Sequence, residues 1–202
     1  MQFISDKEDF LIEKGHINKI FDLNSDLPKN IFNSRFKYFN GFEFDIIYGE
    51  KYFNNLKSFL NQIGDTCFSF YTILPSAENY FLKHFHKYSV ARIDNKNNYD
   101  DYIDFLETDP GNSPADALVH NGETIAMYSS NDHWAMLGSR DCEIGIVGFT
   151  DKKIQSTFID AFGGVYITDV KTRANDLGKM LHFKGTILEF YDNLSSNYKD
   201  RL

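Results

Sequence analysis

The chain has 202 residues, of which 42% are hydrophobic and 25% charged, and its formal net charge is −8. This length and composition suit one globular domain over residues 1–202 with a substantial core, and they argue against extensive disorder. An acidic chain lacks the positive field that neutralises phosphates, so nucleic-acid binding is not expected. A net negative charge instead favours encounter with a basic partner.

The N-terminus and the cysteines both point to a cytoplasmic protein. Residues 1–9 lack the basic and then apolar order of a signal peptide, and no run of about 18 apolar residues predicts a membrane span. Cys67 and Cys142 stand apart without CxxC spacing, which suits a reducing compartment and predicts neither a disulfide nor a metal site. Residues 1 to about 40 show no pattern that assigns an element.

From residue 42 onward, strand and helix patterns alternate. Residues 42–48 begin with apolar and acidic alternation, which predicts a partly buried strand. Helical spacing of apolar residues follows and stops at Gly64. Residues 67–74 then predict a strand that Pro75 closes, Ser76 caps a helix to about His86, and residues 88–93 predict another strand. This order of elements allows a parallel component in the sheet.

The segment Asp94–Asp116 is strongly acidic, with seven Asp or Glu residues against one Lys. Part of it fits an amphipathic helix, and its charges are interpreted either as a solvated face or as a docking surface for a basic partner. The calcium-loop spacing is absent. The candidate partner-binding residues here are Asp100, Asp101, Asp104, Glu107 and Asp109.

Three short β-type runs follow, over residues 123–129, 133–138 and 142–149, with polar turns between them. This spacing predicts a three-strand antiparallel meander at about 123–149. A helix capped by Asp151 and ended by Gly163-Gly164, a strand over 165–170, and helices near 174–181 and 186–198 complete the chain. The predicted class is α+β, a mixed sheet with flanking helices. Core positions are expected at Trp134, Met136, Ile144, Ile146, Phe158 and Phe162.

Motifs of known catalytic and cofactor sites are missing. Neither GxSxG, GxGxxG nor GxxxxGK[ST] occurs, so no catalytic residues and no cofactor are assigned. His84 and His86 are spaced like metal ligands, but on a helix their side chains diverge and no third ligand is nearby, so no metal is expected. The alternative is a small cytoplasmic enzyme of unfamiliar type, whose acid–base or nucleophilic groups come from His120, Glu123, Asp132, His133 and Cys142.

Trp134, Arg140 and Asp141 form a second group of candidate contact residues. Trp and Arg dominate interface hot spots, although burial of Trp134 as a core anchor of the meander is the simpler interpretation. Residues 131–149, fewer than 20 of the 202, resemble the tryptophan-containing hairpin of some small bacterial immunity proteins. Such proteins neutralise polymorphic or contact-dependent toxins by binding them. The resemblance implies an acidic, catalytically silent cytoplasmic domain whose partner is a cognate toxin.

Overall fold

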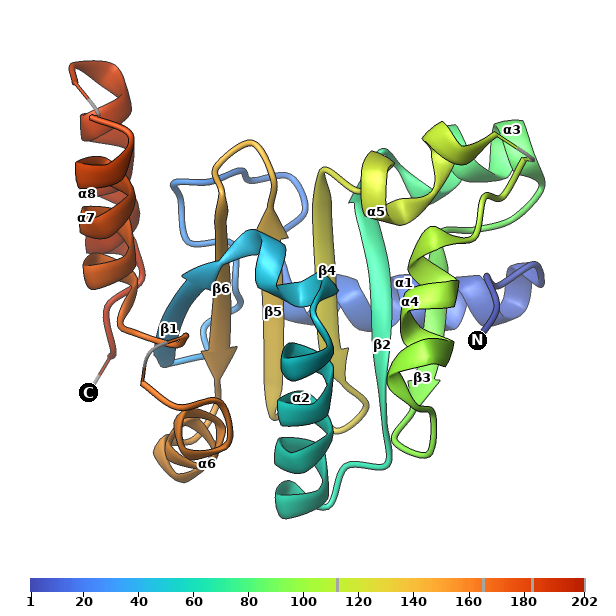
Figure 1. Cartoon of the computed structure of the whole chain (residues 1–202), viewed down its shortest axis with the longest axis horizontal. Helices are drawn as coiled ribbons and strands as arrows, with labels where there is room; N and C mark the ends of the chain where they lie inside the picture. Colours follow the sequence, from blue (N-terminus) through green and yellow to red (C-terminus); the bar gives the residue numbers. More distant parts are fainter. Residues whose placement is uncertain (112, 165, 183, 202) are drawn as a thin grey trace.

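The centre of the fold is a six-stranded sheet in the order β1-β6-β5-β4-β2-β3 (Figure 1). The structure is a computed structural model that describes residues 1–111, 113–164, 166–182 and 184–201. Neighbouring strands of this sheet all pair antiparallel, so the expected α+β class is confirmed and the expected mixed sheet is wrong. The strands are β1 (Tyr38–Glu43), β2 (Cys67–Leu74), β3 (Val90–Asp94), β4 (Thr124–Ser129), β5 (Trp134–Ser139) and β6 (Ile144–Phe149).

Strands β4, β5 and β6 are joined by short turns and pair with each other in sequence order. They make up half of the sheet, and the expected meander therefore describes it only in part. On one side β6 pairs with β1, and on the other β4 pairs with β2, which lies about 50 residues earlier in the chain. The two turns contain Asp132 and Glu143, both with positive φ.

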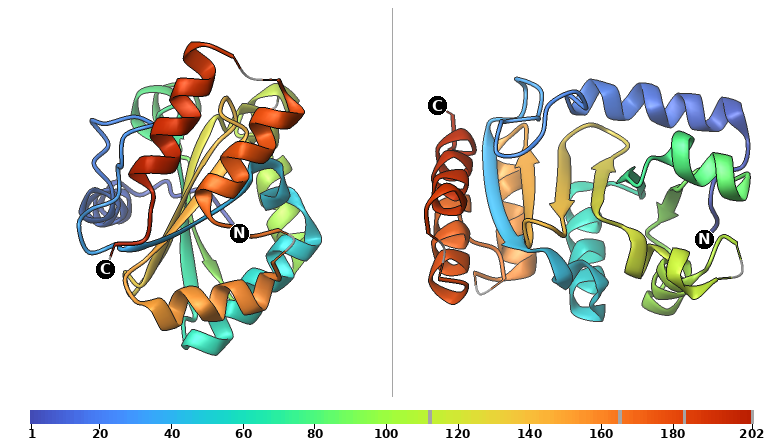
Figure 2. Two further views of the ribbon diagram at one scale, coloured as in Figure 1. Left: turned by 90° about the vertical axis from the view of Figure 1, so that its left-hand side faces the viewer. Right: turned by 90° about the horizontal axis from the view of Figure 1, so that it is seen from above.

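Helices cover both faces of the sheet, as the views along and across it show (Figure 2). One face is covered by α2 (Glu50–Ile63), α4 (Tyr99–Glu107), α5 (Leu118–Asn121) and α6 (Lys152–Phe162), and α1 (Lys7–Ile20) crosses the other. Near the β1 edge, α7 (Val170–Met180) and α8 (Thr186–Asn197) pack as a pair. Shorter elements are η1 (Phe44–Tyr48), η2 (Ala77–Leu82), α3 (Lys83–Phe85) and η3 (Pro114–Asp116).

Both faces of the sheet are consequently buried, each against its own cluster of apolar side chains. All six residues expected in the core are buried, at 3% exposure or less. They divide between the faces, however. Trp134, Met136, Phe158 and Phe162 pack on the side of α2 and α6, whereas Ile144 and Ile146 pack on the side of α1 and α7. Side chains along a strand point alternately to the two faces of a sheet. Val147 of β6 lies opposite Met136 of β5 and shares its face, so its neighbour Ile146 points to the other face.

Two of the expected strands differ in the structure. The strand predicted over residues 42–48 ends at Glu43, and η1 follows. The ring of Phe44 at the start of η1 lies over Gly138, where a Cβ would stand 2.8 Å from that ring. The strand predicted over 165–170 is not formed by its described residues. Val165 lies outside them, Thr168 makes an isolated bridge to Gly41, and α7 begins at Val170. Helix α1 occupies part of the segment in which no element was assigned.

Candidate functional site

Trp134 is part of the core and is not available to a partner. Its side chain is fully buried beside Phe59 and Phe68. The indole Nε1 donates a hydrogen bond to Asp65 Oδ2 over 3.2 Å, and the carboxylate of Asp65 also accepts from Ser129 Oγ at 2.6 Å. A buried indole N–H needs an acceptor and a buried carboxylate needs donors, and the bond between Trp134 and Asp65 meets both needs.

Arg140 also points inward, although it lies in a turn. Its Nη2 donates to the hydroxyl of Tyr48 at 2.7 Å and to the carbonyl of Val119 at 2.8 Å, and its guanidinium lies 5.1 Å from the ring centre of Phe44. Burial raises the pKa of Tyr48 to about 12, despite the opposing effect of Arg140. Arg140 thus fastens the β5–β6 turn to η1 and α5. Its neighbour Asp141 is exposed.

The acidic segment lies on the outer face of α4. Asp100, Asp101, Asp104 and Glu107 are exposed. Asp101 also has a structural role, because it closes a capping box in which its carboxylate accepts from the backbone N–H of Asn98 at 3.0 Å. This bond lowers the pKa of Asp101. Asp109 is half-buried and accepts from the backbone of Gly111 at 2.5 Å, so it does not share that open face.

The residues considered for an acid–base or nucleophilic enzyme are not brought together. Asp132 and His133 lie in the β4–β5 turn, whereas Glu123 and Cys142 lie at the opposite ends of the strands. The six residues of β5 place these groups about 20 Å apart at the usual rise of a strand. His120 lies on α5, and burial raises the pKa of the Cys142 thiol, which disfavours the thiolate.

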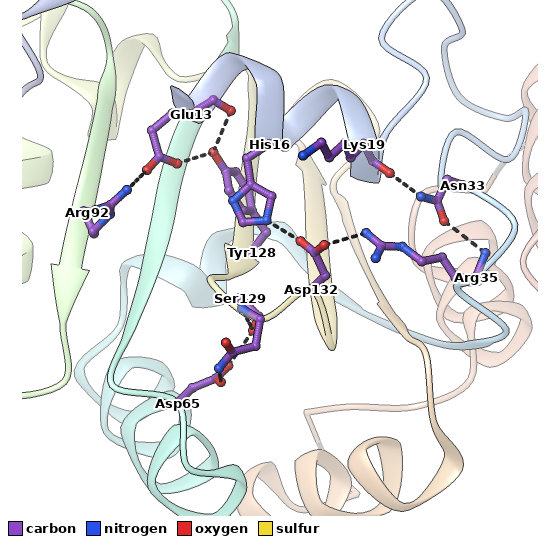
Figure 3. A network of polar contacts seen from close by, with 11 residues as sticks. Glu13, His16, Lys19, Asn33, Arg35, Asp65, Arg92, Tyr128, Ser129 and Asp132 are labelled. Atoms are coloured by element: carbon purple, nitrogen blue, oxygen red, sulfur yellow. Dashed lines mark hydrogen bonds and ion pairs between the residues drawn. The ribbon is translucent and has the colours of Figure 1, made fainter. Parts of the chain in front are cut away.

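Asp132 instead meets two residues from the N-terminal segment (Figure 3). One carboxylate oxygen contacts Nε2 of His16 on α1, and the other lies 2.9 Å from Nη2 of Arg35. Burial alone would raise the pKa of Asp132, but the hydrogen bonds and charges of His16 and Arg35 outweigh it and lower that pKa. No pattern in the sequence indicated this group, since His16 and Asp132 are 116 positions apart.

A second charged group lies one helical turn away on α1. Glu13 is 2% exposed, and its carboxylate accepts from the hydroxyl of Tyr128 at 2.8 Å and from Nη2 of Arg92 at 2.5 Å. Burial would raise the pKa of Glu13, yet its hydrogen bonds and the charge of Arg92 bring it below the ordinary value. Both groups join α1 to the sheet, and every charged member is engaged within the protein.

The described part of the chain holds no cluster of three His, Cys, Asp or Glu side chains suited to a metal ion. His86 caps α3 in a left-handed conformation, with φ of 55°, next to His84 at the end of the helix. Within the same described residues, no helix is both long enough and apolar enough to cross a membrane.

An exposed apolar surface lies where α7 ends and α8 begins. A cavity of about 420 Å³ separates this connection from the β5–β6 turn, and its walls include Cys142, Leu181, Ile187 and Phe190. Four large apolar side chains where α7 ends and α8 begins are exposed by 43 to 61%, and Leu181 and Ile187 among them line the cavity. We call this surface the α7–α8 patch, and it consists of Met180, Leu181, Ile187 and Leu188.

Carboxylates line the adjoining edge of the molecule. Asp141 and Glu143 form one wall of the large cavity, and Glu143 also lines a smaller one of about 160 Å³ together with Glu43 and Asp45. The Asp45 side chain is 74% exposed, whereas the nearby guanidinium of Arg140 is turned toward the protein. We call these four residues, Glu43, Asp45, Asp141 and Glu143, the acidic rim.

Of the candidate contact residues, Asp141 alone therefore belongs to a surface that is both hollowed and apolar. The acidic face of α4 lies elsewhere, and Trp134 and Arg140 serve the interior. The apolar members of the patch were not singled out in the sequence, where they follow ordinary helical spacing. Comparison with known proteins finds no matching protein family, no similar curated protein and no similar solved structure.

Proposed function

We propose that this chain is a non-catalytic cytoplasmic binding protein, an immunity protein that neutralises a cognate toxin by covering a surface the toxin needs. The observation that supports this proposal is the α7–α8 patch beside the acidic rim. Four large apolar side chains are exposed where α7 ends and α8 begins, and two of them, Leu181 and Ile187, line the cavity; exposed apolar groups gathered in this way are typical of an interaction surface. A polar border around an apolar centre is the usual arrangement of a protein interface.

The charge of the rim selects the kind of partner. The four carboxylates of the rim are exposed, and Arg140 forms an ion pair with Asp45 alone among them, at 3.9 Å, while its Nη2 bonds within the protein. A partner that inserts an apolar side chain into the groove and presents Lys or Arg beside it would complement both features. The occupant we propose is therefore a basic segment of a toxin domain with one apolar anchor residue.

A growth-protection experiment tests this proposal. The probe is the C-terminal domain of the protein encoded immediately upstream of this chain, produced in a host cell together with wild type or a variant. We expect wild type to restore growth and Ile187→Asp to lose this protection. Ile187 is 52% exposed in the first turn of α8, where an acidic residue is compatible with the helix dipole, so the fold should persist.

Ile12→Asp is the matched control, because Ile12 is 62% exposed on α1 and lies outside the groove. It should protect as wild type does. An upstream domain without toxicity, or equal protection by both variants, would count against the proposal. Sedimentation of the chain alone provides a second check. A stable dimer that Ile187→Asp dissociates would show that a second copy covers the patch, and would overturn the toxin assignment.

A further inference from the structure

A further cavity, of about 180 Å³, adjoins the large cavity beside the α7–α8 patch. Asp141 and Cys142 line both, so the two cavities meet at the β5–β6 turn. The other walls of the further cavity come from the segment between α1 and β1 and from the adjacent ends of β2, β4 and β5 (Figure 1). We call it the loop cavity. The hollowed surface thus extends from the α7–α8 patch across the turn to the N-terminal segment.

Five aliphatic side chains line the loop cavity, namely Leu23, Leu27, Ile31, Ile73 and Leu137. Ile31 and Leu137 are buried, at 4% and 3% exposure, whereas the other three are half-buried and accessible to solvent. An apolar cavity of about 150 Å³ accommodates a benzene molecule. The loop cavity is therefore large enough to receive one apolar side chain of a partner.

Helix α8 holds the walls of both cavities in place. Its first turns line the large cavity, and its end binds the segment whose earlier residues line the loop cavity. Asn197 Nδ2 donates to the carbonyl of Pro28 at 2.8 Å, and Asn30 Nδ2 donates to the carbonyl of Asn197 at 3.0 Å. The hydroxyl of Tyr198 donates to the carbonyl of Lys29 at 2.7 Å. The fold therefore sets the spacing of the two cavities before a partner arrives, and such preorganisation lowers the cost of binding.

Two carboxylates give the loop cavity a negative charge. Asp26 and Asp141 are exposed, line this cavity and form no ion pair with any residue that the structure describes. No Lys, Arg or His among the described residues lines either the loop cavity or the large one. Arg140, the neighbour of Asp141, instead lines the cavity of about 160 Å³ and pairs there with Asp45 at 3.9 Å. A cationic side chain of a partner would complement the charge of Asp26 and Asp141.

We propose that the two adjoining cavities bind one continuous segment of the toxin domain, with an apolar side chain in each cavity and a Lys or Arg side chain between them. This inference rests on the proposed function, which supplies the anchor in the large cavity, and it adds a second anchor in the loop cavity. Both anchors come from one segment because the cavities share a wall at a single turn. The basic residue lies between them because Asp141 lines both cavities.

Calorimetric titration of the whole chain with the upstream-encoded C-terminal domain tests the second anchor. Thr124 is half-buried at the start of β4 and lines the loop cavity but not the large one. We expect Thr124→Trp, which fills the loop cavity with a residue that strands accommodate, to raise the dissociation constant about tenfold or more, since it excludes one apolar anchor. Thr150→Trp is the matched control, because Thr150 is half-buried just after β6 and lines neither cavity. It should bind as wild type does.

Asp26→Lys tests the charge in the same titration, and its fold should persist because Asp26 is exposed. We expect it to weaken binding about tenfold, whereas Asp160→Lys, the same change on the exposed side of α6, should have little effect. Unchanged binding of Thr124→Trp or Asp26→Lys, with Ile187→Asp weakened, would overturn this inference and leave the proposed function standing. So would an equal loss in Asp160→Lys, which would indicate only general charge attraction. No binding by wild type would overturn both.

Discussion

Asp132 shows how single side chains hold α1 against the sheet. It lies in the β4–β5 turn with φ of 59°, a left-handed conformation that Asp and Asn tolerate better than most residues. From there its carboxylate meets His16 and Arg35, while Glu13 on the same helix meets Tyr128 and Arg92. Polar contacts of this kind fix the position of a helix whose outer face is partly apolar.

The lowered pKa of Asp132 makes its contribution to stability dependent on pH. Because the folded pKa lies below the unfolded value of 3.8, the contribution is present above that value and is lost as the pH falls through the folded pKa. We expect Asp132→Asn to be less stable than wild type at pH 7 and to approach wild type at about pH 3. Asparagine keeps the left-handed turn accessible, so the change isolates the charge.

Urea unfolding at both pH values measures the difference between Asp132→Asn and wild type. Asp104→Asn, which removes an exposed carboxylate from α4, is the control and should change the free energy of unfolding by no more than about 0.5 kcal/mol. The same gap between Asp132→Asn and wild type at pH 7 and pH 3 would mean that the charge of Asp132 does not stabilise the fold.

At the level of elements, helix α6 packs against the rest of the fold through a cluster of aromatic rings around Phe158. The ring of Phe158 lies 5.0 Å from that of Phe59 on α2 and 5.2 Å from that of Phe149 on β6, centre to centre, and it stacks on Phe162 at 4.3 Å. It thereby joins a helix, a second helix and the sheet. Aromatic pairs of this geometry stabilise beyond their buried area.

Removal of the Phe158 ring should destabilise the fold strongly. We expect Phe158→Ala to lower the free energy of unfolding by about 3–5 kcal/mol, because the surrounding rings cannot close the cavity that it leaves. Chemical denaturation followed by the fluorescence of Trp134, the one tryptophan of the chain, gives the measurement. Leu11→Ala on the exposed side of α1 should change it by less than about 1 kcal/mol. A similarly small loss in Phe158→Ala would place Phe158 outside the core.

Elements with local signals could be predicted from the sequence. Helix α2 ends at Gly64 in the left-handed conformation, β2 spans the predicted residues, and Asp151 caps α6. Helix α1 could not be predicted, because its buried stripe includes Glu13 while Leu11 and Ile12 face solvent. The α7–α8 patch could not be predicted from the sequence either. Ile187 and Leu188 follow the spacing of a buried helix face, and their exposure arises only from where α8 packs.

Across the whole molecule, negative charge is concentrated in two separate places. The acidic rim lies at the end of β1, in η1 and in the β5–β6 turn, whereas the carboxylates of α4 lie on the outer face of a helix that packs toward β2. Only the rim adjoins the apolar groove, and charges are screened over about 8 Å at physiological ionic strength, so we expect the rim to affect a basic partner in the groove more than the face of α4 does.

Association kinetics would distinguish the effect of the acidic rim from that of the α4 carboxylates. We expect neutralising the rim with Glu43→Gln, Asp141→Asn and Glu143→Gln to slow association with the toxin domain at physiological salt, and to leave dissociation less affected. The matched α4 variant, Asp100→Asn, Asp104→Asn and Glu107→Gln, keeps the capping carboxylate of Asp101. It should slow association only at low salt, where the screening length reaches about 30 Å. Slower association of the α4 variant at physiological salt would instead place the contact on α4.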